Sequence, residues 1–403
     1  MGNSSCNLCT YPNEEQNIED QQTLTTKADE KKEIKEIKEI KEIKDIKGTI
    51  ESNDIKINNA MTDIIDIPQP ASTIISENEE KPKENEDKIL YILPESLSKR
   101  DNIQTYYQLF PTLLGTGGSS KIFVGINEKG KFAIKQIMKG GVAKPEELIR
   151  EAKISLQVNH KNIIKYYEIY EDKDFIYFVM ELGDEGDLFD FIISGENMCL
   201  SSDITIDLLI QIFEAVDYLH SVKKIIHRDI KPENFLIKID ENNNPIIKLI
   251  DFGLAINMPN NGEKLTEIIG TRKYAPPEML CGYGYNEKID EWAIGVVMFS
   301  MLTGYEPFRR TGPYQVEDSI LFSKIDFEII QDPELMILNM KLLDRIETNR
   351  ITCKEALAYL KELKEVRYIE YNDNYYKNQR YLFIENYKLK LKQKLNEYER
   401  NTV

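Results

Sequence analysis

The sequence of 403 residues lacks a long apolar run, has few cysteines and carries no excess of basic charge. Its longest nearly continuous apolar stretch, 293–302, is ten residues long. That is about half the length of a membrane-spanning helix, so we expect a buried core helix there. The net charge of −17 argues against general nucleic-acid binding, which requires a basic surface. The amino terminus has no apolar segment typical of a secretory signal peptide, and the chain is therefore expected to stay in the cytosol.

The five cysteines fit a reducing compartment rather than a disulfide framework. Cys199, Cys281 and Cys353 are scattered along the chain and show no spacing typical of metal ligands. Cys6 and Cys9 lie close together near the amino terminus. Their position makes them candidates for lipid attachment.

Gly2 follows the initiator methionine, in the acceptor position for N-myristoylation, although Cys6 stands where the usual pattern has serine or threonine. One myristoyl chain binds membranes with an affinity of about 10⁴ M⁻¹, so stable anchoring requires a second signal. Residues 1–47 contain eleven acidic residues against eight lysines and provide no basic patch. Palmitoylation of Cys6 and Cys9 would supply the signal. The sequence thus predicts an acylated chain at the cytosolic face of a membrane, and a free amino terminus with unmodified thiols is the alternative.

A repeat of Glu-Ile-Lys runs from Glu33 to Lys47, with Asp45 as the single variation. A step of three residues drifts by about 60° around a helix of 3.6 residues per turn, so the isoleucines form no continuous stripe. Residues three apart carry like charges, which favours a marginal exposed helix or a solvated spacer over a partner-binding helix. Residues 48–100 are rich in Asn, Asp, Glu, Ser and Pro. We therefore expect residues 1–105 to form a disordered tether.

The most informative motif is His-Arg-Asp-Ile-Lys-Pro-Glu-Asn at 227–234, followed by Asp-Phe-Gly at 251–253. Phosphoryl transfer from ATP requires a carboxylate for the attacking hydroxyl, a carboxylate and an amide for Mg²⁺, and a cation near the moving phosphate. The two segments resemble the catalytic loop and the metal-binding motif of the eukaryotic protein kinases. The resemblance implies that Asp229 orients the hydroxyl and that Lys231 neutralises the γ-phosphate. It gives the Mg²⁺ ligands as Asn234 and Asp251.

The resemblance covers about residues 107–360. It implies an α+β fold of two lobes, a small β-rich N-lobe and a large helical C-lobe, as a kinase domain at 106–360 followed by a tail at 361–403. It also implies ATP and Mg²⁺ as cofactors, proteins as substrates and a monomeric chain. Lys231 with the following Pro-Glu-Asn is similar to the serine/threonine class rather than the tyrosine class.

Upstream, residues 110–122 are typical of a strand, a glycine-rich turn and a second strand, and Ala133-Ile-Lys135 follows on another strand. Glycines let the backbone close over phosphates without a Cβ in the way. The kinase pattern has a third glycine where Ser120 stands, at a position that contributes to nucleotide affinity. The resemblance gives Met180 the gatekeeper position and places the backbone of Glu181 and Gly183 at the adenine. The residues expected at the nucleotide are Gly115, Thr116, Gly117, Gly118, Ser119, Ile122, Ala133, Lys135, Met180, Glu181, Gly183, Asp187 and Glu233.

By resemblance, Lys135 contacts the α- and β-phosphates and pairs with a glutamate on the helix expected within 145–158. Glu151 matches the family position. Glu146 and Glu147 are the alternatives, because both lie in the first turn after a proline, where acidic side chains stabilise the helix dipole.

Two other residues have two interpretations each. Asp187 stands where the family binds ribose or a substrate arginine, and it is also placed to cap the helix 188–193; the two roles are compatible. His227 is interpreted as a structural residue that supports the 251–253 turn rather than as a base, because Asp229 is available for the chemistry. The resemblance further implies a structural pair, Glu278 with Arg350, and a brace for the catalytic loop backbone, Asp290.

The activation segment is expected at 251–278. Thr271 matches the threonine that contacts the catalytic aspartate and lysine. Glu267 occupies the place where many kinases carry a regulatory phosphothreonine, and its carboxylate could pair with Arg228 without an upstream kinase. It would be a weaker partner than a phosphate, which carries about −1.5 to −2 charges. Thr266 is the competing phosphorylation site.

Three strings resemble the calcium/calmodulin-dependent kinases and the calcium-dependent kinases of plants and protists; they lie at 184–190, 290–292 and 304–308. No EF-hand is expected, since residues 372–375 lack the central glycine and the terminal glutamate of a Ca²⁺ loop. Residues 380–400 have the pattern of a basic amphipathic helix, which is typical of a calmodulin target or an autoinhibitory segment. The alternative is a helix that packs along its own domain or stays exposed.

The sequence therefore predicts a monomeric serine/threonine protein kinase on an acylated tether. Asp187 and Glu233 near the substrate groove favour substrates with basic residues near the phosphoacceptor. The rival interpretation is a membrane-tethered pseudokinase scaffold with weak or no phosphoryl transfer, and Ser120 is its support.

Overall fold

The computed structural model describes residues 91–116, 120–142, 144–183, 186–308, 315–370 and single positions between 382 and 393. All of them belong to one compact unit, 85–403. The predictions for Gly2, Cys6, Cys9 and the Glu-Ile-Lys repeat lie outside the described residues. So do those for Gly117, Gly118, Ser119, the string at 184–185, residues 372–375 and most of 380–400.

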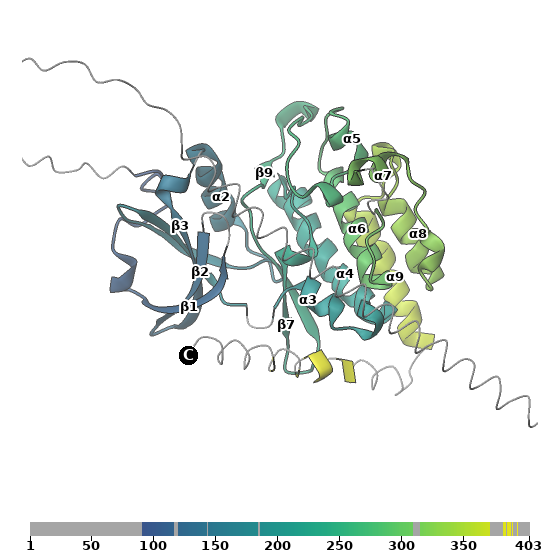
Figure 1. Ribbon diagram of the computed structural model, residues 1–403, viewed down its shortest axis with the longest axis horizontal. Coiled ribbons are helices and arrows are strands. Elements are labelled where there is room, and N and C mark those ends of the chain that lie inside the picture. Colours follow the sequence, from purple (N-terminus) through teal and green to yellow (C-terminus); the bar gives the residue numbers. More distant parts are fainter. Residues whose placement is uncertain are drawn as a thin grey trace, which may run out of the picture. The chain divides into compact units, whose positions relative to one another are not determined.

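The N-lobe is built on a five-stranded sheet in which neighbouring strands are antiparallel and follow the order β1-β2-β3-β5-β4. A single α-helix, α2, accompanies this sheet and contacts β4 (Figure 1). Strand β5, between β3 and β4, is buried over most of its length because its sequence is nearly all apolar. The elements are β1 Gln108–Thr116, β2 Ser120–Asn127, β3 Gly130–Met138, α2 Pro145–Gln157, β4 Tyr166–Glu171 and β5 Phe175–Glu181.

The C-lobe is mainly helical and carries two small two-stranded sheets, β6 with β9 and β7 with β8. Its α-helices are α3 Leu188–Ile193, α4 Ser202–Asp217, α5 Pro277–Leu280, α6 Lys288–Thr303, α7 Val316–Phe322, α8 Pro333–Leu342 and α9 Cys353–Glu370. Its strands are β6 Ile225–Ile226, β7 Phe235–Ile239, β8 Pro245–Leu249 and β9 Ile256–Asn257. Short helical turns complete the chain: η1 Ile103–Thr105, η2 Lys139–Gly141, η3 Glu196–Met198, η4 Tyr218–Lys223, η5 Pro232–Asn234, η6 Asn260–Gly262, η7 Arg272–Tyr274, η8 Phe327–Ile329 and η9 Glu347–Asn349.

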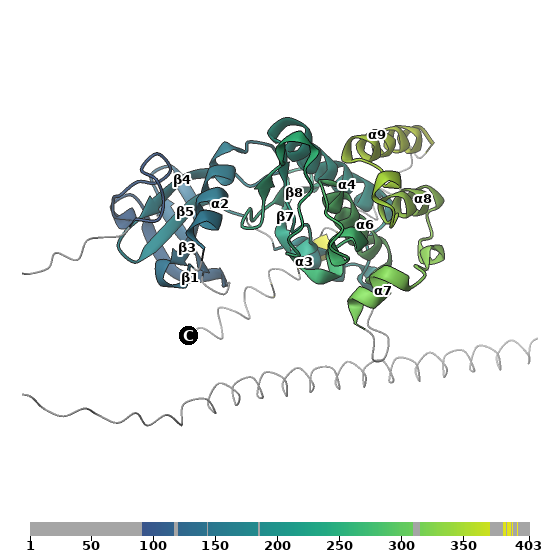
Figure 2. The ribbon, with the colours of Figure 1, turned by 90° about the horizontal axis from the view of Figure 1, so that it is seen from above.

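Helix α6 is the centre of the C-lobe and contacts both α4 and α8, between which it lies in Figure 2. Twelve of its 16 residues are buried, as expected for a helix that is apolar on all sides. Gly295 allows α8 to approach closely, because a Cβ at this position would lie 2.9 Å from the Cβ of Leu342. The prediction of a buried core helix at 293–302 is confirmed.

The packed structure extends beyond both domain boundaries that the sequence suggested. It begins at Tyr91 rather than at 106, since Leu93 and Ile103 are only 2% and 1% exposed. The composition of this segment is polar, and its burial depends on tertiary contacts that composition does not show. At the other end, α9 runs past residue 360, and Tyr387 packs against Phe191 of α3 with ring centroids 4.8 Å apart. That contact is of the kind expected from a tail that packs along its own domain.

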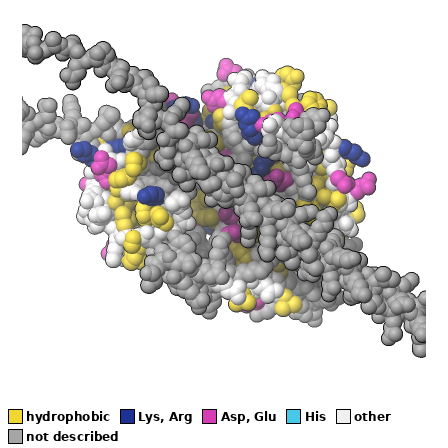
Figure 3. Space-filling model, in the orientation of Figure 1, with side chains coloured by type: hydrophobic (Ala, Val, Ile, Leu, Met, Phe, Trp, Pro, Cys, Tyr) yellow, Lys and Arg dark blue, Asp and Glu magenta, His cyan; other side chains and the backbone are white. Residues whose placement is uncertain are grey.

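Basic, acidic and apolar side chains are mixed over the described part of the face in Figure 3. Among the described residues, no helix combines the length and the apolar character that crossing a membrane would require.

Candidate active site

A chain of ion pairs connects the two lobes at Lys135. This β3 side chain lies 2.8 Å from Glu151 Oε1 on α2 and 3.2 Å from Asp251 Oδ1 in the C-lobe. Glu151 lies on the buried face of α2, whereas Glu147 in the first turn pairs with Lys144 at the surface. Of the three candidate glutamates, Glu151 is thus the one that reaches Lys135.

Electrostatics keep both ends of this chain charged. Burial alone would lower the pKa of Lys135, but the negative charges of Glu151 and Asp251 outweigh it and raise the pKa. The charge of Lys135 in turn lowers the pKa of Asp251. The Asp251 side chain is still 45% exposed, so an anionic carboxylate faces the space between the lobes, beside a fixed cation.

Three polar side chains, two of the catalytic loop and one of the activation segment, surround Asp229. Lys231 Nζ donates to Asp229 Oδ2 at 2.6 Å, and Asn234 Nδ2 donates to the same oxygen at 2.8 Å. Thr271 of the activation segment donates to Asp229 Oδ1 at 3.2 Å and also lies 3.4 Å from Lys231 Nζ. The structure therefore brings together, around the Asp229 carboxylate, the residues that the sequence predicted to act in phosphoryl transfer.

Asp290 at the start of α6 holds the backbone of this loop. Its Oδ2 accepts from His227 N at 2.8 Å and its Oδ1 accepts from Arg228 N at 3.0 Å. Arg228 has a left-handed backbone with φ of 66°, a conformation that costs a residue other than glycine about 1–3 kcal/mol. The two buried hydrogen bonds from Asp290 help to stabilise it.

His227 is fully buried, and its ring lies edge-on to Phe252 with centroids 5.4 Å apart. Its Nε2 lies 3.3 Å from the carbonyl oxygen of Ile250. Both contacts are with the segment around the Asp-Phe-Gly turn, as a supporting role requires.

Arg228 connects the loop to the activation segment. Its Nε donates to the carbonyl of Leu254 at 2.7 Å, and its Nη1 lies 3.3 Å from both Glu267 Oε2 and the hydroxyl of Tyr285. The Arg228 side chain is 1% exposed, whereas Glu267 is 67% exposed. Glu267 thus reaches the buried arginine from the surface, while Thr266 is itself exposed. Tyr285 is a partner that the sequence did not indicate, because no motif marks it.

The segment between the lobes packs closely against both of them. Met180 is buried at the end of β5, opposite Ala133 of β3. Gly183 passes so near to β7 that an added Cβ would lie 2.4 Å from Leu236 Cδ1. Asp187 accepts from Asp190 N at 2.8 Å and caps α3, which is one of its two expected roles.

The remaining predicted positions are placed as follows. Gly115 and Thr116 end β1, opposite Ile122 and Lys121 of β2, and Ser120 begins β2. The Oε2 atom of Glu181 accepts a hydrogen bond from Lys248 Nζ at 3.0 Å. Glu233 lies in η5, and its Oε2 is buried with no hydrogen-bond partner among the described residues.

Glu278 and Arg350 form a buried two-pronged pair, with Nη1 to Oε1 at 2.7 Å and Nη2 to Oε2 at 3.0 Å. Both side chains are at most 8% exposed. The pair joins the end of the activation segment to the segment before α9, as predicted from the sequence.

The donor set fits Mg²⁺ and a nucleotide. Asp251 supplies a carboxylate, and Asn234, which donates its amide hydrogens to Asp229, supplies an amide oxygen; both are ligands that Mg²⁺ prefers. Lys135 is a cation suited to phosphates. The fold and this site together have the arrangement expected of a two-lobed phosphotransferase.

A family model described as the protein kinase domain matches residues 110–360. The chain belongs to the protein kinase family. It is 38% identical over 270 residues to calcium-dependent protein kinase 5 of Plasmodium berghei, which covers 63% of this chain and 46% of the relative.

Two further relatives extend the comparison. Calcium/calmodulin-dependent protein kinase type 1 of Macrobrachium nipponense is 33% identical over 260 residues, covering 61% of this chain and 72% of the relative. The probable serine/threonine-protein kinase pXi of Dictyostelium discoideum is 33% identical over 247 residues, covering 61% and 34%. The chain thus spans about half the length, or less, of several curated relatives. The predicted kinase fold and the resemblance to calcium-dependent and calmodulin-dependent kinases are confirmed.

Proposed function

We propose that the chain transfers the γ-phosphate of ATP to serine or threonine hydroxyls of protein substrates. The observation that carries this proposal is the consecutive pairing of Glu151 with Lys135 and of Lys135 with Asp251, together with the Asp229 cluster in the C-lobe. The chain thus carries the charged residue types that the reaction requires.

Asp229 accepts the hydrogen bond of the incoming hydroxyl and takes its proton as the new bond forms. Lys231, held 2.6 Å from this carboxylate, carries the positive charge closest to it. Lys135 is fixed by Glu151 to bind the nucleotide phosphates. Asp251 and Asn234 would hold Mg²⁺, which would neutralise negative charge on the phosphates. ATP would supply the phosphoryl group that is transferred.

Serine and threonine specificity is supported by the Lys231-Pro-Glu-Asn string and by the names of the relatives. A preference for basic residues near the acceptor is supported by Asp187 and Glu233, two carboxylates that the resemblance places near the substrate groove. An oriented peptide library with no basic preference on the amino-terminal side of the acceptor would refute this specificity.

The test of the proposed activity compares wild type with Lys135→Met and Asp251→Asn in a γ-phosphate transfer assay. Wild type should transfer phosphate at a rate at least about 100-fold above both variants, because each variant removes a charge from the phosphate site. Equal background counts in all three proteins would favour the pseudokinase scaffold, for which Ser120 in the glycine-rich turn is the supporting feature.

We further propose that the chain is a monomer held at the cytosolic face of a membrane by acylation of Gly2 with palmitoylation of Cys6 and Cys9. The support is the amino-terminal sequence, since a single acyl chain would be insufficient. The intact mass of the amino-terminal peptide from cells tests it; an unmodified mass would disprove the anchor.

A further inference from the structure

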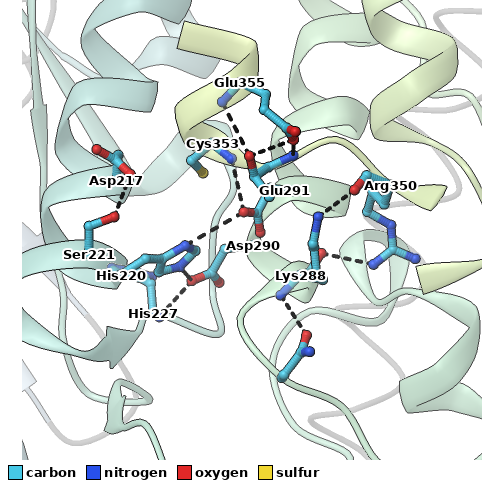
Figure 4. A network of polar contacts seen from close by, with 12 residues as sticks. Asp217, His220, Ser221, His227, Lys288, Asp290, Glu291, Arg350, Cys353 and Glu355 are labelled. Atoms are coloured by element: carbon cyan, nitrogen blue, oxygen red, sulfur yellow. Dashed lines mark hydrogen bonds and ion pairs between the residues drawn. The ribbon is translucent and has the colours of Figure 1, made fainter. Parts of the chain in front are cut away.

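A histidine, a glutamate and a cysteine lie close together inside the C-lobe, although they come from segments far apart in the sequence. All three residue types can bind metals. His220 comes from η4, Glu291 from α6 and Cys353 from the first position of α9. They are 7%, 2% and 2% exposed. One donor atom of each lies within 4.8 Å of the others, and His220 Nδ1 is 3.7 Å from Glu291 Oε1. Figure 4 shows the three side chains converging beside Asp290.

The other ring nitrogen of His220 is already engaged. Its Nε2 lies 2.8 Å from Asp290 Oδ2; in the tautomer that donates from Nε2 to this carboxylate, Nδ1 is the ring nitrogen left for a metal. Histidines that bind metals usually donate their second ring N–H to a carboxylate in this way. In that tautomer Nδ1 faces Glu291, whose Oε1 lies 3.7 Å away.

Glu291 carries an unsatisfied acceptor in this cluster. Its Oε1 accepts from Cys353 N at 3.1 Å, but its Oε2 is buried with no hydrogen-bond partner among the described residues. A buried carboxylate oxygen without a partner is costly, and buried charges are normally paired or bound to a metal. The cluster therefore has both a donor set and a charge that a cation would balance.

We propose that His220, Glu291 and Cys353 bind one Zn²⁺ ion. A set of one nitrogen, one oxygen and one sulfur suits zinc and disfavours Mg²⁺ or Ca²⁺, which prefer oxygen ligands. In a tetrahedral site with metal–ligand bonds of about 2.0–2.3 Å, donor atoms lie roughly 3.3–3.8 Å apart. The observed 3.7 Å between His220 Nδ1 and Glu291 Oε1 fits that spacing.

Binding forms the zinc–sulfur bond as the Cys353 thiol releases its proton to solvent. The thiolate and the Glu291 carboxylate then balance the two positive charges of the ion, and a water molecule takes the fourth position. Through His220 and Asp290 the site contacts the backbone of His227 and Arg228. A metal bound here would thus stabilise, through His220 and Asp290, the backbone of the loop that carries Asp229.

The test measures metal in the full-length protein after zinc loading and extensive dialysis. Wild type should retain about one zinc ion per chain, and Cys353→Ala and Glu291→Gln should each lose most of it. Cys281→Ala, which removes an exposed thiol, is the matched control and should retain the ion. A Cys6→Ala/Cys9→Ala variant removes the two cysteines near the amino terminus and should also retain the zinc ion.

A second readout keeps the test independent of how the variants fold. Cobalt should replace zinc in wild type and give a thiolate-to-cobalt charge-transfer absorption, which Cys281→Ala retains and Cys353→Ser lacks. Calorimetric titration of chelator-treated wild type with Zn²⁺ should show one site. Zinc-free wild type that binds no added Zn²⁺, or zinc lost only in the Cys6/Cys9 variant, would overturn the proposal.

Discussion

Arg228 and Asp251 have left-handed backbone conformations, with φ of 66° and 62°, and they lie at the two carboxylates that the proposed reaction uses. Arg228 directly precedes Asp229, and Asp251 is itself the proposed Mg²⁺ ligand. Residues with side chains rarely adopt this conformation unless their surroundings enforce it. Here Asp290 holds Arg228, and Lys135 with Gly253 N holds Asp251. The positions of both carboxylates therefore depend on anchoring contacts from other segments of the chain.

At the residue scale, Glu267→Ala should lower the transfer rate of the unphosphorylated enzyme about two- to fivefold. Its pair with Arg228 orders the activation segment, but Glu267 is 67% exposed, and exposed pairs contribute only about 0.2–1 kcal/mol. Steady-state kinetics on protein free of phosphate at Thr266 measures the effect. Glu263→Ala, also exposed, is the control. An unchanged rate in Glu267→Ala would contradict activation without phosphorylation, and a loss in Thr266→Ala would point to the competing site.

The Glu278–Arg350 pair allows a second prediction at this scale. Arg350→Leu leaves the Glu278 carboxylate buried without a partner and should lower the free energy of unfolding by about 3–5 kcal/mol. The double variant Glu278→Leu/Arg350→Leu should recover much of that loss, because neither charge is then left unpaired. Urea denaturation of the four proteins in this cycle measures both effects. If the double variant were as unstable as the sum of the single ones, the pair would not be the cause.

At the scale of elements, the sequence predicted those features whose pattern is local. Helix α6 is apolar on all sides, and Glu151 lies on the same face of α2 as Leu148 and Ala152, so both placements follow from helical periodicity. The catalytic loop was found because its chemistry is concentrated in eight consecutive residues, 227–234.

Features that depend on contacts between distant segments could not be predicted in this way. Cys353 seemed isolated in the sequence, but the packing of η4, α6 and α9 brings it to His220 and Glu291. For the same reason, the sequence did not predict that residues 91–105 pack against the domain. Their backbone is held by Glu171 at the end of β4, which no local pattern connects with Leu93.

Glu171 accordingly carries a prediction about one element. Its carboxylate accepts from Ile92 N at 2.5 Å and Leu93 N at 3.0 Å, and it pairs with Arg100 and Lys139 at 2.5 and 2.9 Å. Burial raises its pKa, but these hydrogen bonds and charges outweigh the burial and lower the pKa below its ordinary value of 4.5.

Since the folded pKa is the lower one, the stabilisation by Glu171 is fully present above pH 4.5 and is lost as the pH falls further. Glu171→Gln should lower the free energy of unfolding at pH 7 by about 1–3 kcal/mol. The difference between wild type and variant should shrink as the pH falls below 4.5. Denaturant titrations between neutral and acidic pH measure it, with the exposed Glu95→Gln as control. A difference that does not change with pH would exclude the carboxylate charge as its origin.

At the scale of the whole molecule, all the described residues proposed for catalysis lie within the unit 85–403. The proposed acylation sites, Gly2, Cys6 and Cys9, lie outside this unit. Our two proposals thus place membrane attachment and chemistry in separate parts of the chain, and a deletion can separate them. The effect of a deletion on activity and stability depends on where the deletion ends, because residues 91–105, which precede the predicted boundary at 106, belong to the packed structure.

Deletion of residues 1–84 should leave the transfer rate on a soluble peptide within about twofold of wild type, since it removes no described contact. Deletion of residues 1–105 also removes Leu93 and Ile103, each at most 2% exposed. Burial of each such side chain is worth about 1.5–3 kcal/mol, so the longer deletion should lower the melting temperature by several degrees and reduce activity. Calorimetry and peptide kinetics on the two deletions, with the full chain as reference, make the comparison. Equal melting temperatures for both deletions would show that the segment from Tyr91 to Thr105 contributes nothing to the kinase fold.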